Sequence, residues 1–191
     1  MGCGADIRKE YLNVDYFDSK GVDKVLDLEK FPYPFEENSF KEIVMQDILE
    51  HLNDPIKTLE EIFRISKHNA KIKIRVPHFS SGNVWGDLTH KRGFSSTIFN
   101  HFDLEKNKHS TSLEKKRKMN FKIKKVRLHF PAPYRFIGFN QIFSIYPLLY
   151  ERMFYGIFPC GNISFEIENK KKKNEKNINN QIRCNRRLCS I

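Results

Sequence analysis

The sequence of 191 residues predicts a single α/β domain built on a mostly parallel sheet. Three observations support this fold class. A glycine-containing bend at residues 2–4 precedes a short apolar segment, residues 11–15, that ends on a carboxylate. A second segment of the same kind follows at residues 22–28. Strand-like and helix-like patterns then alternate with short connections, which is typical of parallel strands joined by right-handed crossovers.

The bend and the two segments after it indicate a nucleotide site. Glycine allows backbone N–H groups to approach a ligand closely, because it has no Cβ. Asp15 and Asp27 each stand at the tip of an expected strand. A carboxylate in that position can accept the hydroxyls of a ribose. Both residues could instead stabilise a turn or cap a helix. Two carboxylates at strand tips in this order favour ribose binding over that structural role.

The middle of the chain predicts a strand, a helix and a second strand. Residues 40–46 are β-branched at their centre and predict a strand, and residues 47–52 predict a helical turn. Asp54 followed by Pro55 is a helix start, with a side-chain cap and proline in the first turn. Apolar residues then recur at helical spacing as far as residue 65, and Asn69 is suited to the left-handed conformation that ends helices. Residues 71–77 alternate and predict a strand.

The remainder is less regular. The expected elements are a polar loop at 80–93 containing Trp85, a short helix at 94–102, a charged linker at 105–118, a strand at 121–130 with a bulge at 124–125, aromatic helices within 138–158 and a last strand at 163–167. We therefore expect one domain over residues 1–169. Residues 170–191 are basic and rich in asparagine, and predict a disordered tail.

The net charge of +11 is concentrated in two places. Residues 106–127 and the tail from residue 170 are strongly basic, so the rest of the chain is slightly acidic. Such patches suggest nucleic acid, an anionic lipid surface or a phosphorylated substrate, or simply a solvated strand face and tail. The four cysteines form no CxxC pair, and neither a secretory signal nor a membrane-spanning stretch is visible. We expect a reduced, cytoplasmic protein.

Several strings resemble the class I S-adenosylmethionine-dependent methyltransferases, specifically the type 11 methyltransferase domain. They are GCG at 2–4, NVD at 13–15, DLEKFPYPFEENSF at 27–40, LEHL at 49–52, EIFRISKHNAKIKIRVPH at 61–78 and YERMFYGIFP at 150–159. The resemblance implies a three-layer, Rossmann-like fold with an antiparallel last strand. It also implies S-adenosylmethionine as cofactor and methyl transfer to a small-molecule, glycan or lipid-type acceptor.

The resemblance also assigns residues to the cofactor. Gly2, Cys3 and Gly4 would line its methionine and ribose side, and Asp15 would bind the ribose hydroxyls. The remaining positions carried over are Asp27 and Leu28 at the adenine, and Met45 and Gln46, which would close over the cofactor.

The chain departs from the family at three places. Only Met1 stands before the bend, where the family has an apolar strand, so the first strand is largely missing and the chain could be inactive. Lys41 replaces the usual Asp after the phenylalanine of the third strand segment. Residues 67–70 replace a Lys-Pro-Gly-Gly turn with a stiffer one.

Methyl transfer needs alignment more than acid–base chemistry, because the sulfonium is already a good leaving group. A base is useful when the acceptor is a hydroxyl or a protonated amine. Asp87 and His90 follow the last parallel strand, where this fold opens its acceptor pocket, and His78 ends that strand. A neutral imidazole held by Asp87 could take the proton, or the pair could simply tether the loop.

We expect no metal ion, although one face of the predicted turn carries ligand-type residues. Asp47, Glu50 and His51 have i, i+3, i+4 spacing, and a similar cluster in ubiquinone-pathway O-methyltransferases is associated with a divalent metal. A structural or substrate-positioning role is the preferred interpretation.

A non-catalytic alternative remains open: a methyltransferase-derived module that binds RNA or another polyanion. Its contacts would be the tail and the basic residues of the strand at 121–130, namely Lys122, Lys124, Lys125 and Arg127. Polyanion binding should weaken steeply as salt rises. RNA methylation is ranked lower, because the Asn-Pro-Pro-Tyr-type motif of base aminomethylases is absent.

Overall fold

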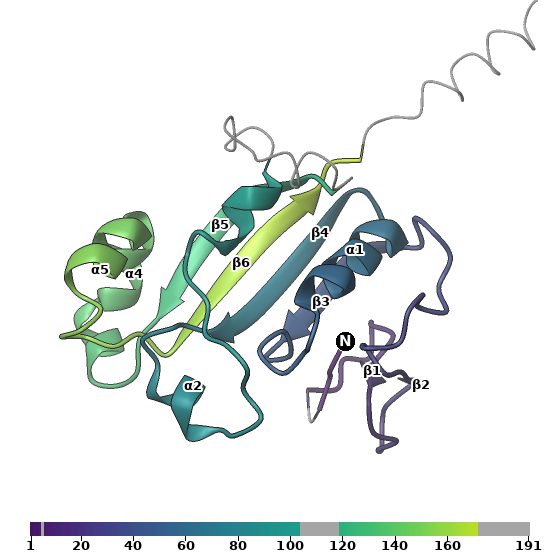
Figure 1. Cartoon of the computed structure of the whole chain (residues 1–191), viewed down its shortest axis with the longest axis horizontal. Coiled ribbons are helices and arrows are strands. Elements are labelled where there is room, and N and C mark those ends of the chain that lie inside the picture. Colours follow the sequence, from purple (N-terminus) through teal and green to yellow (C-terminus); the bar gives the residue numbers. More distant parts are fainter. Residues whose placement is uncertain (5, 104–118, 172–191) are drawn as a thin grey trace, which may run out of the picture.

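The computed structural model describes residues 1–4, 6–103 and 119–171 (Figure 1). Its centre is a four-stranded sheet in the order β3-β4-β6-β5. These strands are β3 (Phe40–Gln46), β4 (Ser66–Pro77), β6 (Asn162–Asn169) and β5 (Phe121–His129). β3 and β4 are parallel, whereas β6 runs antiparallel to both β4 and β5. Three strands therefore share one direction and the last is reversed, which confirms the expected Rossmann-like α/β fold.

Two further strands lie beside β3 as a separate pair (Figure 1). β1 (Val14–Asp15) and β2 (Lys24–Val25) are parallel and much shorter than predicted. The first residues of the chain span the space between β1 and β3. The Met1 amino group donates to the Val44 carbonyl at 2.9 Å, and the Cys3 N–H donates to the Val14 carbonyl at 3.2 Å. These two bonds link the first residues to β3 and to β1.

The helix α1 (Pro55–Ile65) begins where the sequence predicts. The Asp54 side chain accepts a hydrogen bond from the Lys57 N–H at 3.0 Å, which satisfies one of the free donors of the first turn. Leu59, Ile62 and Ile65 form its buried face. The helix ends at residue 65, and Asn69, with φ 61°, lies within β4 rather than at the helix end.

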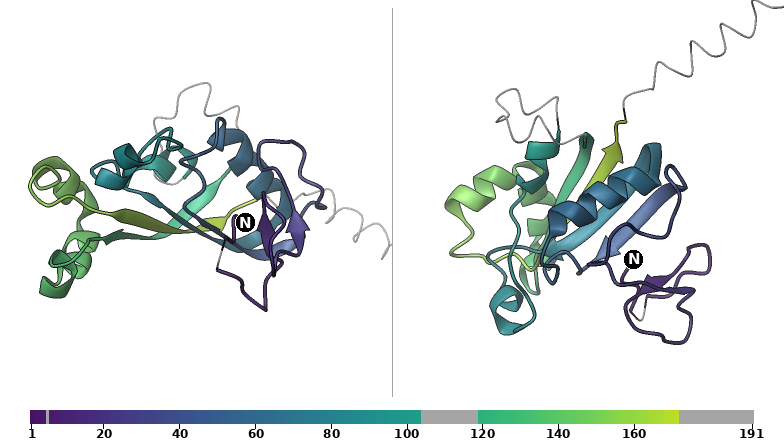
Figure 2. Two further views of the ribbon diagram at one scale, coloured as in Figure 1. Left: turned by 90° about the horizontal axis from the view of Figure 1, so that it is seen from below. Right: turned by 45° about the vertical axis from the view of Figure 1, so that its right-hand side comes forward.

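One face of the sheet carries the helical layer. α1 and the short helix η1 (Ile98–Phe102) pack there, with the Phe63 ring 5.5 Å from Phe121 and the Phe99 ring 4.8 Å from Phe165. The opposite face presents half-exposed ion pairs, including Lys73–Glu42, Lys124–Glu168 and Arg127–Glu166. Figure 2 shows α1 lying along one side of the sheet, with β1 and β2 beyond its β3 edge. Residues 16–23, which join β1 to β2, are fewer than the dozen that a helical crossover requires.

Three short helices within residues 134–153 pack along the outer edge of β5. Here lie η2 (Tyr134–Ile137), α4 (Phe139–Ile145) and α5 (Pro147–Met153). The Ser144 hydroxyl accepts from the Leu128 N–H at 2.9 Å, and the Asn140 side chain accepts from the Phe130 N–H at 2.8 Å. These side chains satisfy backbone donors of an edge strand, which protects it from pairing with another chain.

The register of β5 shifts between Ile123 and Lys125, so the predicted bulge is confirmed. The loop at 80–93 contains a helix, α2 (Gly82–Gly86), and the helix expected at 94–102 is the shorter η1. The linker expected at 105–118 lies outside the described residues, as does the tail expected at 170–191 apart from its first two residues. No helix in the described ranges has the length and apolar character needed to cross a membrane.

Candidate functional site

The glycine bend is held by Asp15. The Gly4 N–H donates to Asp15 Oδ2 at 2.7 Å, and the N–H groups of Tyr16 and Phe17 donate to Oδ1 at 2.8 and 3.3 Å. Burial alone would raise the pKa of Asp15, but the three backbone donors outweigh it and lower the pKa. Asp15 is therefore ionised at neutral pH and lies against the bend.

Both glycines of the bend adopt conformations that other residues disfavour. Gly2 has φ 59° and Gly4 has φ 48°. A Cβ on Gly2 would lie 2.1 Å from Ile48 Cδ1, whereas a Cβ on Gly4 would meet nothing within 4 Å. Gly2 thus allows close packing of the bend onto the segment after β3, and Gly4 leaves an open approach to its backbone.

Asp27 and Leu28 follow β2, next to Asp15, because Asp15 pairs with Val25 in register. Asp27 accepts from the Glu29 N–H at 2.9 Å and lies 3.7 Å from the Lys30 ammonium. Leu28 is buried and its carbonyl accepts from the Tyr33 hydroxyl at 2.9 Å. Asp27 thus has turn-capping contacts, two residues beyond the end of β2.

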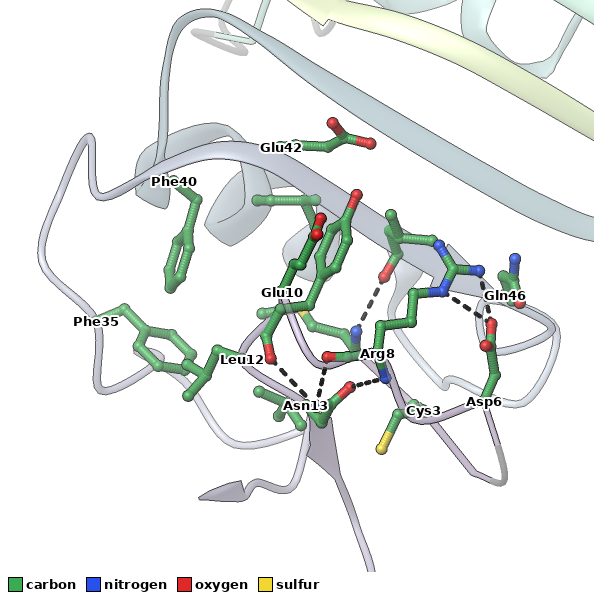
Figure 3. Close-up of a pocket in the computed structure, with 16 residues that line it drawn as sticks. Cys3, Asp6, Arg8, Glu10, Leu12, Asn13, Phe35, Phe40, Glu42 and Gln46 are labelled. Atoms are coloured by element: carbon green, nitrogen blue, oxygen red, sulfur yellow. Dashed lines mark hydrogen bonds and ion pairs between the residues drawn. The ribbon is translucent and has the colours of Figure 1, made fainter. Parts of the chain in front are cut away.

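The two residues at the end of β3 differ in environment. Met45 is 1% exposed and belongs to the core. Gln46 faces the bend. With its amide nitrogen toward Asp6 and its oxygen toward Arg8, the side chain lies 3.2 Å from each. Asp6 and Arg8 form an ion pair at 2.6 Å beside it (Figure 3).

A cavity of about 360 Å³ lies between β1 and β3. Its walls include the bend, residues 10–14 and the strand residues Glu42 and Val44 (Figure 3). This is the space that a strand between β1 and β3 would fill. The cavity therefore belongs to the broken sheet and lies beside, not at, the carboxylates of Asp15 and Asp27.

A second group of polar side chains lies beyond the carboxyl ends of β3 and β4. One ligand atom from each of Glu50, His51 and His90 lies within 4.8 Å of the other two. Glu50 is fully buried, and burial raises its pKa to about 7. Among the described residues neither of its carboxylate oxygens has a hydrogen-bond partner. The His51 and His90 rings are in edge contact, with centroids 4.7 Å apart.

Asp47 does not join this group. Residues 47–52 form turns rather than the expected helical turn, and Asp47 itself is left-handed with φ 52°. Its carboxylate instead makes a bidentate ion pair with Arg75 of β4. The i, i+3, i+4 spacing therefore brings only Glu50 and His51 to the cluster.

His78 is buried and both ring nitrogens are engaged. The Ser80 N–H donates to Nδ1 at 3.2 Å, so the ring proton is on Nε2, which faces Glu151 Oε1 at 3.2 Å. Glu151 also accepts from the Ser96 N–H. His78 therefore connects the end of β4 to α5, and this arrangement positions the loop at 80–93.

Asp87 and His90 lie close together in that loop. The two side chains are 3.7 Å apart, and burial of Asp87 is slight. Asp87 accepts hydrogen bonds from the hydroxyl and N–H of Thr89 at 2.7 and 2.8 Å, which lower its pKa. His90 Nδ1 lies 3.0 Å from the Asn83 carbonyl. The loop therefore holds an ionised carboxylate beside the imidazole.

Sequence reasoning missed the pairing of His51 with His90 and the role of Glu151. The two histidines are far apart in the sequence, and only the adjacency of β3 and β4 brings their loops together. A usable signal was that polar residues follow two neighbouring parallel strands. Glu151 lies in an aromatic segment, and no local pattern connects it to His78.

The basic residues of β5 face acidic residues of β6. Lys122 pairs in register with Glu168, and Lys125 with Glu166. Lys124 lies 3.1 Å from Glu168, and Arg127 lies 4.0 Å from Glu166. The charge of this strand is therefore partly balanced within the sheet.

Comparison with known proteins gives a family match. Residues 2–74 match the sequence profile of a family described as a methyltransferase domain. No curated protein sequence matches the chain. Solved structures also align with it. A proposed methyltransferase from Bacillus halodurans is 14% identical, with 88% of this chain and 84% of that chain covered and a TM-score of 0.49. A SAM-dependent methyltransferase from Archaeoglobus fulgidus is 14% identical, with coverages of 82% and 74% and a TM-score of 0.47, and an S-adenosylmethionine-dependent methyltransferase from Mesorhizobium loti is 12% identical, with coverages of 81% and 78% and a TM-score of 0.44. Residues 2–74 of the chain therefore resemble a methyltransferase domain.

Proposed function

We propose that this chain binds S-adenosylmethionine at its glycine bend and transfers the methyl group to a small-molecule, glycan or lipid-type acceptor. One observation carries the proposal: within the segment that matches the methyltransferase family, an ionised Asp15 clamps the bend at residues 2–4. Asp27 stands on the neighbouring strand tip. Together they provide acceptors for a ribose and open backbone for the rest of the cofactor.

The donor set is compatible with an adenosyl group. A carboxylate offers about four lone-pair sites, and backbone N–H groups take three of those on Asp15. The Cys3 thiol contacts the same carboxylate, so a ribose hydroxyl would replace this weak donor. The open space beside Gly4 allows a ligand to reach the bend. Asp27 keeps further lone pairs, since one backbone N–H and one lysine contact it.

When bound, S-adenosylmethionine supplies an activated methyl group, and the protein's task is to align the acceptor with it. For a hydroxyl acceptor, we assign proton removal to His90. Its Nδ1 is anchored at the Asn83 carbonyl, which leaves Nε2 toward Asp87. His78 acts as a positioning residue, because both of its nitrogens are engaged inside the protein.

The alternative, a polyanion-binding module, rests on the basic strand and the tail. Lys124 and Arg127 are paired with glutamates of β6, which weakens that case for the strand. Salt separates the two functions. Binding to an RNA oligonucleotide should fall steeply between 50 and 200 mM salt, on the order of a thousandfold for six or more phosphate contacts, while cofactor affinity should change little.

Calorimetric titration with S-adenosylhomocysteine tests the proposed function. The unaltered chain should bind one equivalent, and Asp15→Ala should weaken binding at least tenfold, because it removes both the ribose acceptor and the clamp on the bend. Asp18→Ala is the matched control, since Asp18 is exposed in the same loop. Equal binding by Asp15→Ala and the control, or no binding by the unaltered folded chain, would reject this cofactor site.

A further inference from the structure

The cluster of Glu50, His51 and His90 has the composition of a metal site. Glu50 is 0% exposed, and both of its oxygens lack a hydrogen-bond partner within the described ranges. A buried carboxylate normally has partners, because an unpaired one loses its hydration without compensation. One imidazole nitrogen each of His51 and His90 lies within 4.8 Å of a Glu50 carboxylate oxygen. A cation between them would provide the missing partner.

The hydrogen bonds around His51 determine which of its nitrogens is free. The Thr89 hydroxyl donates to Asp87 Oδ1, 2.7 Å away. The Thr89 oxygen then accepts from His51 Nδ1, which lies 2.9 Å from it. His51 therefore carries its proton on Nδ1 and has a lone pair on Nε2.

His90 has the same tautomer for a different reason. Its Nδ1 lies 3.0 Å from the Asn83 carbonyl, and a carbonyl only accepts. The proton is therefore on Nδ1, and Nε2 is again free. Histidines that bind metals commonly donate their other ring N–H to a carbonyl or a carboxylate, which fixes the ring and raises the basicity of the ligand nitrogen. The His90 ring is held in that way, and the His51 ring donates to the Thr89 hydroxyl instead.

We propose that Glu50, His51 and His90 bind a divalent first-row transition-metal ion, with zinc as the ion of reference. Three donors around a tetrahedral zinc lie about 3.3 Å apart, given bond lengths near 2.0–2.1 Å. Small side-chain rotations bring donors that lie within 4.8 Å to that separation. Two neutral imidazoles and one carboxylate leave a net charge of +1, which the nearby Asp87 offsets.

A site with three protein ligands leaves a fourth position for water or a hydroxyl group. It lies beyond the carboxyl ends of β3 and β4, where ligands of open α/β sheets bind. Metal binding would use the lone pair of His90 Nε2, so it replaces the role of His90 as a free base. The inference does not depend on S-adenosylmethionine binding, and it is tested without measuring methyl transfer.

The test is metal binding by the full chain after removal of metal with a chelator. Equilibrium dialysis against Zn²⁺ and the visible absorption spectrum of bound Co²⁺ are the two readouts. Both are measured in a Cys184→Ser/Cys189→Ser background, which removes two thiols that could also bind these ions. We expect one ion per chain, and at least a tenfold loss of affinity in Glu50→Gln and in His90→Ala.

Two further variants complete the design. His68→Ala is the matched control, because His68 is an exposed histidine of β4 remote from the cluster in sequence; it should bind as the parent does. Thr89→Val removes the partner of His51 and should weaken binding by about 10–100-fold, as loss of a supporting hydrogen bond does, whereas Thr89→Ser should retain it. Circular dichroism verifies that each variant is folded. Equal affinities in the folded parent, His90→Ala and Thr89→Val, or no stoichiometric binding by the folded parent, would overturn the proposal.

Discussion

Replacing Glu50 by glutamine should stabilise the metal-free protein at pH 8. The side chain is fully buried, has no hydrogen-bond partner in the described part of the chain, and burial raises its pKa from 4.5 to about 7. Each pKa unit corresponds to about 1.4 kcal/mol, so the ionised carboxylate costs roughly 3 kcal/mol at pH 8. Glutamine has the same shape and no charge, so it avoids this cost.

The effect should depend on pH in a defined direction. An acid whose pKa is raised by folding holds its proton more tightly in the folded state. Below about pH 4.5 both states are protonated and the substitution is nearly neutral. As pH rises from 4.5 to 7, only the unfolded state loses its proton, so the free energy of unfolding of the parent falls. At pH 5 the variant should therefore be more stable than the parent by less than about 1 kcal/mol.

Urea denaturation with a chelator, at pH 5 and pH 8, measures the difference. With typical urea m-values, about 3 kcal/mol shifts the midpoint by roughly 1–3 M. Glu60→Gln is the control, because Glu60 is exposed on α1, and it should shift neither midpoint appreciably. A variant no more stable than the parent at pH 8, or a gain of equal size at both pH values, would show that Glu50 is not an uncompensated buried carboxylate.

Three further predictions concern the local structure. Asp54→Ala should lower the free energy of unfolding by about 1 kcal/mol, because it removes the side chain that accepts a hydrogen bond from the Lys57 N–H. Urea denaturation measures this free energy. An equally large loss of stability in Asp54→Ser would contradict the capping role. Gly4→Ala should lower the free energy of unfolding by about 1–2 kcal/mol, because Gly4 has a positive φ. Gly82 has open space around it and no positive φ, so Gly82→Ala should change that free energy by no more than about 0.5 kcal/mol. A short Val/Leu-rich extension before Met1 should fill the space between β1 and β3 and raise the thermal midpoint of unfolding. Burial of one such side chain stabilises the folded state by about 1.5–3 kcal/mol. An equal rise of the midpoint with a Ser/Gly extension would refute strand insertion.

Local patterns predicted the elements whose stability is mainly local. β3 and α1 begin at the predicted residues, because β-branched alternation and the Asp54–Pro55 cap act within a few residues. The bulge in β5 was visible as a phase slip. β1 and β2 were predicted too long. The two strands pair over only two residues each, and the start of the chain adds one backbone hydrogen bond to β1, from the Cys3 N–H to the Val14 carbonyl.

The sequence by itself determined the fold class and the order of the strands along the chain. These follow from periodicity, caps and strand-tip residues, which depend on near neighbours. Only the tertiary structure decided that Glu50 and His51 meet His90, that Asp47 turns away to Arg75, and that His78 is engaged inside the protein. Those contacts join residues far apart in the chain, and which loops meet is set by how the strands pair in the sheet.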